Sequence, residues 1–230
     1  MNLRTPTAAQ ISAIKAVLFA LCLIPLALYV QRGLDDALGA NPIETITHAS
    51  GEWTLRFLLI TLAVTPLRRF SGLNWLLRLR RMLGLFAFFY ACLHATTYFW
   101  LDQFFDLYAI AKDIMKRPFI TIGFAAFMLL VPLALTSNNY AIRRMGGRRW
   151  QSLHRSVYAI GILAIVHFWW LVKADILKPA IYAVLLAALL GMRGWWRELE
   201  RRRQLAPATP LAPPPRGKVI PLVVKARRQT

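Results

Sequence analysis

The sequence predicts an all-α integral membrane protein, a bundle of six transmembrane helices. Hydrophobic residues make up 57% of the 230 residues, and the mean hydropathy is +0.46, which is well above the balance of a soluble protein. These residues form separate, almost uncharged stretches, most of them long enough to cross a hydrocarbon core about 30 Å thick. The stretches are uniformly apolar and do not alternate with a period of two, so we expect helices and not barrel strands.

Six such stretches follow one another along the chain. The expected spans are residues 12–31, 54–67, 82–101, 118–136, 151–172 and 179–196. The first is longer than the apolar region of a signal peptide, which is usually about 7 to 15 residues, so we interpret it as a transmembrane helix. The second is the shortest and carries Arg56, whose side chain must reach the interface or face protein. We expect residues 1–200 to form one membrane domain.

The formal net charge of +19 follows the expected loops in an alternating pattern. The loops after the second and fourth spans contain no acidic residue but many arginines, namely Arg68, Arg69, Arg78, Arg80, Arg81, Arg143, Arg144, Arg148 and Arg149. The loops after the first and third spans mix acidic and basic residues. The positive-inside rule therefore predicts six spans with both termini in the cytoplasm. The charge indicates topology and contact with anionic lipid, and it argues against nucleic-acid binding.

The cysteines and the C-terminal segment indicate no additional folded module. Cys22 and Cys92 both fall inside expected spans, where a free thiol behaves as a small hydrophobic side chain, so we expect no disulfide. Residues 201–230 are rich in proline and arginine and lack helical periodicity. This composition predicts a disordered, basic cytoplasmic tail. The tail either lies along the anionic leaflet or is solvated without a separate function.

Three of the four histidines lie on expected spans, where an imidazole is costly and needs a reason. His94 is on the third span, and His154 and His167 are on the fifth. Counted from the cytoplasmic ends, His94 lies about 12 residues and His167 about 16 residues into its span, so both fall in the periplasmic half. Two imidazoles at similar depth fit the axial ligands of a b-type haem. Hydrogen bonding between helices or a proton relay would also place histidines there.

His154 lies thirteen residues before His167, which corresponds to about 220° of rotation and about 20 Å of rise in an ideal helix. The two therefore do not share a face unless the helix bends. His154 could ligate a second haem with a different opposite ligand, or could bond a propionate. Arg81 stands thirteen residues before His94, where a histidine would complete a second pair. Arg80 and Arg81 either neutralise propionates or anchor the helix at the lipid headgroups.

The remaining candidate residues are less specific. His48 falls in the first expected extramembrane loop, where exposure to solvent or contact with a partner is the expected role. Small and aromatic residues surround the histidines of the spans. They suit the edge of a macrocycle and ordinary helix packing equally well, and include Ala91, Ala95, Tyr98, Phe168 and Trp169.

Three long segments carry a family resemblance. They read NPIETITHASGEWTLRFLLITLAVTPLRR from Asn41, RRMLGLFAFFYACLHATTY from Arg80, and RRWQSLHRSVYAIGILAIVHFWW from Arg148. Together they resemble the MsrQ (YedZ) family of haem-binding membrane subunits, which belongs to the ferric-reductase-like transmembrane family. The resemblance covers nearly the whole membrane portion and excludes the tail after about Arg201.

The resemblance implies an electron-transfer subunit and not the catalytic subunit of a periplasmic methionine sulfoxide reductase system. It implies haem b, with FMN as a further cofactor, and electron transfer from the quinone pool or a cytoplasmic flavin reductase to the periplasmic molybdopterin enzyme MsrP. His94 and His167 match the family's haem ligands, and His154 is a further candidate. Larger relatives in the family use two histidines on each of two helices. Because Arg81 stands where one of these histidines would be, the resemblance leaves open whether the chain binds one or two haems. A transporter or an assembly factor without a redox cofactor is the alternative.

Overall fold

The computed structural model describes residues 6–172 and 175–205. Within these residues all regular secondary structure is helical, so the predicted all-α class is confirmed there. The elements are α1 (Ala8–Leu34), α2 (Pro42–Ser71), η1 (Asn74–Leu76), α3 (Leu77–Thr96), η2 (Thr97–Asp102), α4 (Leu107–Lys116), α5 (Pro118–Leu135), α6 (Asn139–Met145), α7 (Gly147–His154), α8 (Val157–Leu171) and α9 (Leu177–Leu205). Here η1 is a short 3₁₀ helix and η2 is a π-helix.

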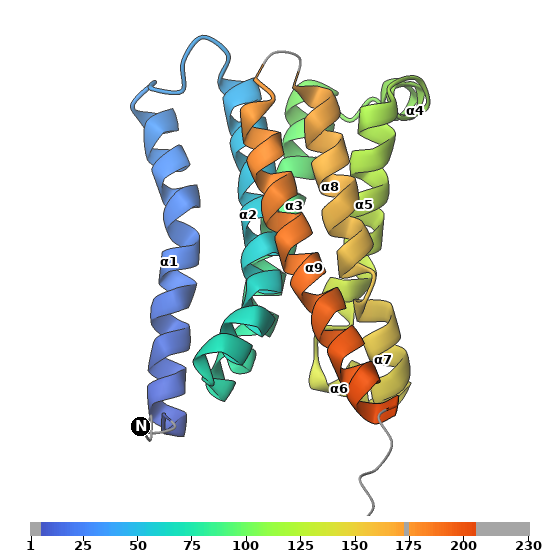
Figure 1. Cartoon of the computed structure of the whole chain (residues 1–230). Coiled ribbons are helices and arrows are strands. Elements are labelled where there is room, and N and C mark those ends of the chain that lie inside the picture. The colour runs from blue at the N-terminus through green and yellow to red at the C-terminus, as the bar shows by residue number, and fades with distance from the viewer. Residues whose placement is uncertain (1–5, 173–174, 206–230) are drawn as a thin grey trace, which may run out of the picture. The chain divides into compact units, whose positions relative to one another are not determined.

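The chain divides into two compact units, Met1–Arg193 and Gly194–Thr230, with the boundary inside α9. In the first unit, hereafter the main unit, the long helices run side by side (Figure 1), and the most extensive contacts join α2 to α3 and α5 to α8. We call the end where α2 and α5 begin and α3 and α8 finish the cavity end. The opposite end, which carries α6 and α7, is the basic end.

Local sequence signals set the helix boundaries. Asn41 caps α2 by accepting a hydrogen bond from the backbone N–H of Glu44, and Pro42 occupies the first turn, where a missing N–H costs nothing. The same helix stops at Gly72, whose φ of 72° places it in the left-handed region that favours glycine. Asp106 caps α4 through two backbone N–H groups. Asn41 and Asp106 thus define where α2 and α4 begin, and Gly72 defines where α2 ends.

A proline inside α2 is compensated by a side chain from another helix. Pro66 has no N–H, so the carbonyl of Leu62 lacks its usual helical donor. The Arg193 guanidinium of α9 donates to this carbonyl and also, over 2.9 Å, to the Tyr158 hydroxyl of α8. Because a backbone carbonyl in hydrocarbon has no water to bond, the contact stabilises α2 and ties three helices together.

Four helical segments are long and apolar enough to cross a membrane: Ala8–Leu34, Asn74–Asp102, Pro118–Leu135 and Leu177–Leu205. They coincide with the first, third, fourth and sixth expected spans. The second and fifth expected spans correspond to α2 and α8, which do not meet these criteria. The structure therefore supports a multi-helix membrane domain, and a count of six spans remains a proposal.

The fifth expected span is not one helix, so the prediction that His154 and His167 share a helix is wrong. α7 ends at His154 and α8 begins at Val157. The Ser156 hydroxyl donates to the carbonyl of Leu153 over 2.7 Å at this break, and such side-chain bonds compete with the helical pattern. His154 and His167 therefore lie on consecutive helices, α7 and α8.

The C-terminal prediction also needs a correction at its start. α9 continues to Leu205, five residues into the segment that was expected to be disordered. Glu198 forms ion pairs with Arg201 and Arg202, three and four residues later, which favours helix there. The rest of the expected tail, residues 206–230, lies outside the described residues.

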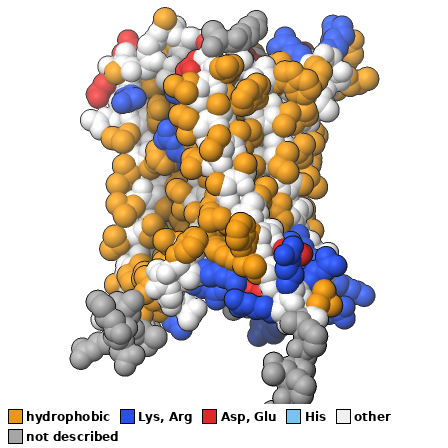
Figure 2. Space-filling model, viewed as in Figure 1, with side chains coloured by type: hydrophobic (Ala, Val, Ile, Leu, Met, Phe, Trp, Pro, Cys, Tyr) orange, Lys and Arg blue, Asp and Glu red, His pale blue; other side chains and the backbone are white. Residues whose placement is uncertain are grey.

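Charge is distributed unevenly between the two ends of the main unit. Arg68 and Arg69 lie in the last turn of α2, and Arg143 and Arg144 in the last turn of α6, so they belong to the basic end. On the face drawn in Figure 2, apolar side chains cover the flanks of the helices. This distribution matches the alternation read from the sequence.

Candidate functional site

A cavity of about 850 Å³ opens within the main unit, with walls formed by α2, α3, α5 and α8 near the cavity end. The volume lies within the range of about 300 to 1,000 Å³ typical of small-molecule sites. Much of the wall is apolar, with lining residues that include Leu55, Leu58, Phe127, Leu130 and Phe168. The cavity is therefore suited to a large, mainly apolar ligand.

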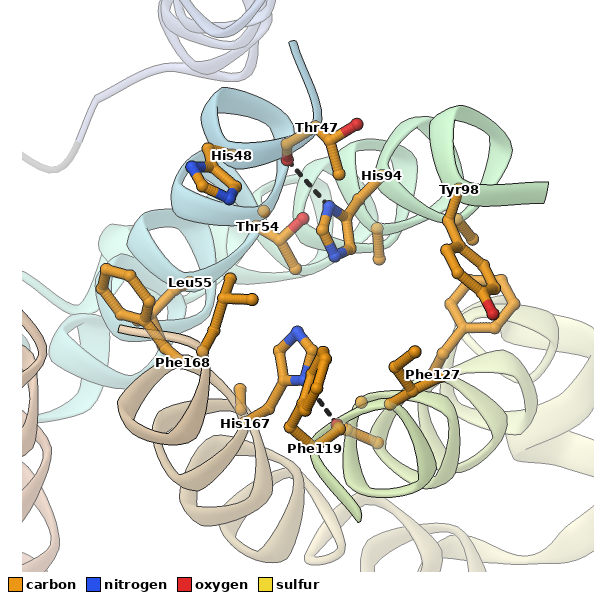
Figure 3. A pocket seen from close by; sticks show the side chains of 18 of the residues that line it. Thr47, His48, Thr54, Leu55, His94, Tyr98, Phe119, Phe127, His167 and Phe168 are labelled. Carbon is orange, nitrogen blue, oxygen red and sulfur yellow. Dashed lines mark hydrogen bonds between the residues drawn. The ribbon is translucent and has the colours of Figure 1, made fainter. Parts of the chain in front are cut away.

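His94 projects into this cavity from α3 (Figure 3). Its Nδ1 lies 2.9 Å from the backbone carbonyl oxygen of Thr47 on α2. A carbonyl can only accept, so Nδ1 carries the hydrogen and donates it. In the neutral ring Nε2 is then an unprotonated acceptor, and Figure 3 shows this nitrogen directed into the cavity.

His167 repeats this arrangement on the opposite wall. Its Nδ1 lies 2.7 Å from the backbone carbonyl oxygen of Phe119 on α5, so the same reasoning leaves Nε2 as the free acceptor. Figure 3 shows the two Nε2 atoms directed toward each other across the cavity. The hydrogen bond of each Nδ1 to a carbonyl is the kind of partner that fixes the tautomer and orientation of a metal-binding histidine.

The separation of the two rings fits one metal ion between them. The centroids of His94 and His167 are 6.1 Å apart and the ring planes are inclined by 74°. A first-row metal binds an imidazole nitrogen at about 2 Å, and the ring centre lies about 1 Å behind it, so two opposite ligands place their centres about 6 Å apart. Among the described residues no group of three or more histidine, cysteine or acidic side chains could hold a metal ion. The pair thus suits a metal that brings its own equatorial ligands.

His48 also lines the cavity. This position was not predicted from the sequence. It was expected in a loop, but α2 begins at Pro42, so His48 lies in the second turn of a helix. Its side chain is exposed, as expected. The capping pattern of Asn41, Pro42 and Glu44 was the signal that could have revealed the earlier helix start.

Charged side chains occur around the same cavity. Arg117 and Lys178 are the basic residues of its lining. The Nε of the exposed Arg117 lies 3.4 Å from the half-buried Asp113 carboxylate. Neither residue was singled out from the sequence, because basic residues in mixed-charge loops carry no distinctive pattern.

A polar network joins the cavity wall to α9. Arg56 pairs with Glu52, and its Nε donates to the Tyr182 hydroxyl over 3.0 Å. That hydroxyl donates to the Glu52 carboxylate over 2.8 Å. Arg56 therefore faces protein partners, which was one of the two arrangements expected for a charge within this span. Glu52 also lines the cavity, so its charge is paired where the wall is otherwise largely apolar.

His154 does not join the pair. Its Nε2 lies 3.0 Å from the Thr136 hydroxyl, and its ring stacks on Trp150 with centroids 3.9 Å apart. The Trp150 indole N–H donates to the Thr136 carbonyl over 2.9 Å. Two contacts therefore occupy this imidazole at the basic end, away from the cavity lining.

Arg80 and Arg81 are likewise outside the cavity lining. Both lie in the first two turns of α3, and Arg81 donates to the Asn139 side chain of α6 over 2.8 Å. The structure therefore does not bring these arginines to the His94–His167 site. A role in neutralising propionates would require a separate site at the basic end.

Comparison with known proteins places the chain in a family. Residues 50–165 match the family described as "Ferric reductase like transmembrane component". The matched stretch includes His94 and ends two residues before His167. No solved structure matches the chain.

Curated relatives match over most of the chain. A protein of Azospira oryzae named "Protein-methionine-sulfoxide reductase heme-binding subunit MsrQ" is 58% identical over 96% of this chain and 93% of its own length. Proteins of the same name from Herminiimonas arsenicoxydans and Ralstonia nicotianae are 54% and 52% identical, covering 87% and 81% of this chain and 93% and 87% of their own lengths. The chain belongs to the MsrQ family of membrane proteins, within the ferric-reductase-like transmembrane components.

Proposed function

We propose that this chain is a haem b electron-transfer subunit of the bacterial inner membrane. It takes electrons from the quinone pool or a cytoplasmic flavin reductase and passes them to a periplasmic molybdopterin methionine sulfoxide reductase, MsrP, for the repair of oxidised periplasmic proteins. Family membership and the names of the relatives support a haem-binding role in this reductase system. The partner and the donors are what the family resemblance implies.

The observation that carries the proposal is the facing pair of histidines. His94 and His167 come from different helix pairs, each has its Nδ1 held by a carbonyl, and the ring centroids are 6.1 Å apart in a cavity of about 850 Å³. Helix packing alone gives no reason for both Nε2 atoms to face one cavity. A haem held between two histidines would give both rings a reason to face the same cavity.

Each part of the wall has a distinct role in the proposal. His94 and His167 would bind the iron, and the carbonyls of Thr47 and Phe119 hold both rings in the tautomer that leaves Nε2 free. The apolar wall excludes water from the site. When bound, haem supplies a one-electron carrier whose potential depends on its axial ligands, its burial and nearby charge. Arg117 and Lys178 would hold the propionate carboxylates, in place of Arg80 and Arg81.

The proposed topology has six spans with both termini in the cytoplasm. The arginines of the basic end support this orientation through the positive-inside rule. α2 has 30 residues, about 45 Å at 1.5 Å per residue, so its length suffices for a span. α8 has 15 residues and is short for a complete span. The cavity end then faces the periplasm, the side of the proposed electron acceptor.

The test is a reduced-minus-oxidised absorption spectrum of the detergent-purified chain, with haem quantified per polypeptide. We expect a b-type signal at one haem per chain, and the His154→Ala variant should retain it because His154 lies outside the cavity lining. Flavin fluorescence of the same denatured sample tests for FMN. A chain purified from haem-replete cells without a b-type signal would overturn the proposal and favour a transporter or an assembly factor.

A further inference from the structure

Two glycines lie directly against the rings of the facing histidines. Gly51 on α2 is four residues after Thr47, and Gly123 on α5 is four residues after Phe119, the two residues whose carbonyls accept from the histidines. A Cβ at Gly51 would come within 3.0 Å of the His94 ring, and a Cβ at Gly123 within 2.7 Å of the His167 ring. A side chain at Gly123 would therefore force the His167 ring to move, and one at Gly51 would press tightly on the His94 ring.

The four-residue spacing has a physical explanation. In an α-helix the N–H of residue i+4 donates to the carbonyl of residue i, so the side chain of residue i+4 lies beside that carbonyl. The carbonyl has a second lone pair, which an imidazole N–H can reach only if this side of the helix is open. Glycine opens it, at a cost of about 1 kcal/mol relative to alanine inside a helix. The same solution occurs twice, once for each histidine.

We propose that Gly51 and Gly123 are positioning residues that determine the orientation of the two imidazoles. Each glycine exposes a helix carbonyl to the ring Nδ1–H and lets the ring lie against the backbone. Together they maintain the 74° inclination between the ring planes. The α2–α3 and α5–α8 pairs thus each supply one histidine and one glycine against which its ring lies. We call each such glycine, with the carbonyl it exposes, a glycine seat. The consequence for haem rests on the proposed function, whereas the ring orientation does not.

Other glycines of the main unit provide matched controls. A Cβ at Gly84 would meet only the Thr61 methyl group at 3.7 Å, an ordinary contact, and a Cβ at Gly191 would meet nothing within 4 Å. Both lie inside long helices, α3 and α9. Alanine at either position adds the same methyl group to a helix without approaching a histidine ring.

The experiment compares Gly51→Ala and Gly123→Ala with Gly84→Ala and Gly191→Ala in the full chain. Loss of a partner that orients a metal ligand typically lowers metal affinity about 10- to 100-fold. We expect the larger loss of haem for Gly123→Ala, whose contact is the shorter, and a smaller loss for Gly51→Ala. The haem that remains should show a changed ferric electron paramagnetic resonance spectrum, because its anisotropy depends on the angle between the axial imidazole planes. The control variants should match the parent protein.

A second measurement is independent of haem. Nitrogen chemical shifts of ¹⁵N-labelled histidine rings report which nitrogen is protonated, and they should change for His94 in Gly51→Ala and for His167 in Gly123→Ala. If the parent chain holds no haem, the proposed function fails while these shifts still test the glycine seats. Parent-like ring shifts in both variants would overturn the inference, as would a parent-like resonance spectrum in haem-loaded protein. Gly51→Ala, the milder change, keeps the test available if Gly123→Ala does not accumulate.

Discussion

The cavity end and the basic end of the main unit each contain histidine, but they use it differently. At the cavity end, His94 and His167 bond carbonyls through Nδ1 and leave Nε2 directed into a cavity. At the basic end, the Nε2 of His154 lies at bonding distance from the Thr136 hydroxyl and Trp150 covers the ring. The difference teaches that a histidine within a membrane domain becomes a ligand candidate only where a nitrogen is free and the space beside it is open.

The largest expected effect separates these histidines directly. His94→Ala or His167→Ala should remove most of the bound haem, because one axial ligand cannot replace two. His154→Ala should retain it, since Thr136 and Trp150 already occupy that ring. Haem per polypeptide and the Soret band of each purified variant provide the measurement. Equal loss in the His154 and His167 variants would contradict the distinction between the two ends.

A moderate effect on the haem midpoint potential is expected from the basic residues that line the cavity, Arg117 and Lys178. Replacing Arg117 and Lys178 by glutamine should lower the haem midpoint potential. Positive charge near the haem stabilises its reduced state, and the substitutions remove that charge. A shift on the order of 30 mV is expected, about threefold in the one-electron equilibrium constant. A redox titration followed by absorbance measures it.

The matched control replaces Arg80 and Arg81 by glutamine at the basic end. This variant should leave the midpoint potential within about 10 mV of the parent value, since both arginines lie outside the cavity lining. A larger shift from the Arg80 and Arg81 variant than from the Arg117 and Lys178 variant would place the propionates at the basic end.

The smallest expected effect is on stability alone. Thr136→Val removes the hydroxyl that bonds His154 and that also donates to the Pro132 carbonyl. The substitution should lower the free energy of unfolding by about 2 kcal/mol, at about 1 kcal/mol for each hydrogen bond. Thermal unfolding in detergent gives the change, and the haem spectrum should remain as in the parent. A spectral change would show that His154 contacts a haem after all.

The depth match of His94 and His167 could be predicted from the sequence because the rise of a helix is uniform, so residue counts translate into depth. The offset of His154 was also foreseeable, but its cause was not, since the break at Ser156 depends on one local side-chain bond. His48 was misplaced because polar residues conceal the first turns of α2 from a hydropathy pattern.

The seats of the two histidines could not be predicted, because they depend on contacts between helices. Gly51 and Gly123 are ordinary helix glycines in sequence, and only the approach of α3 to α2 and of α8 to α5 reveals their role. Arg117 and Lys178 depend in the same way on which helix ends meet at the cavity. Pairings of distant segments are not encoded in the periodicity of one sequence.

The contact between Arg193 and the Leu62 carbonyl joins residues 131 positions apart, which bears on the order of assembly. In the proposed six-span topology α2 enters the bilayer before α9 is synthesised, so Pro66 leaves one backbone carbonyl without its helical donor while the intervening helices insert. Such a group costs several kcal/mol in hydrocarbon. Arg193 of α9 thus supplies the hydrogen-bond donor that α2 lacks, and a chain truncated before α9 would leave the Leu62 carbonyl without this donor.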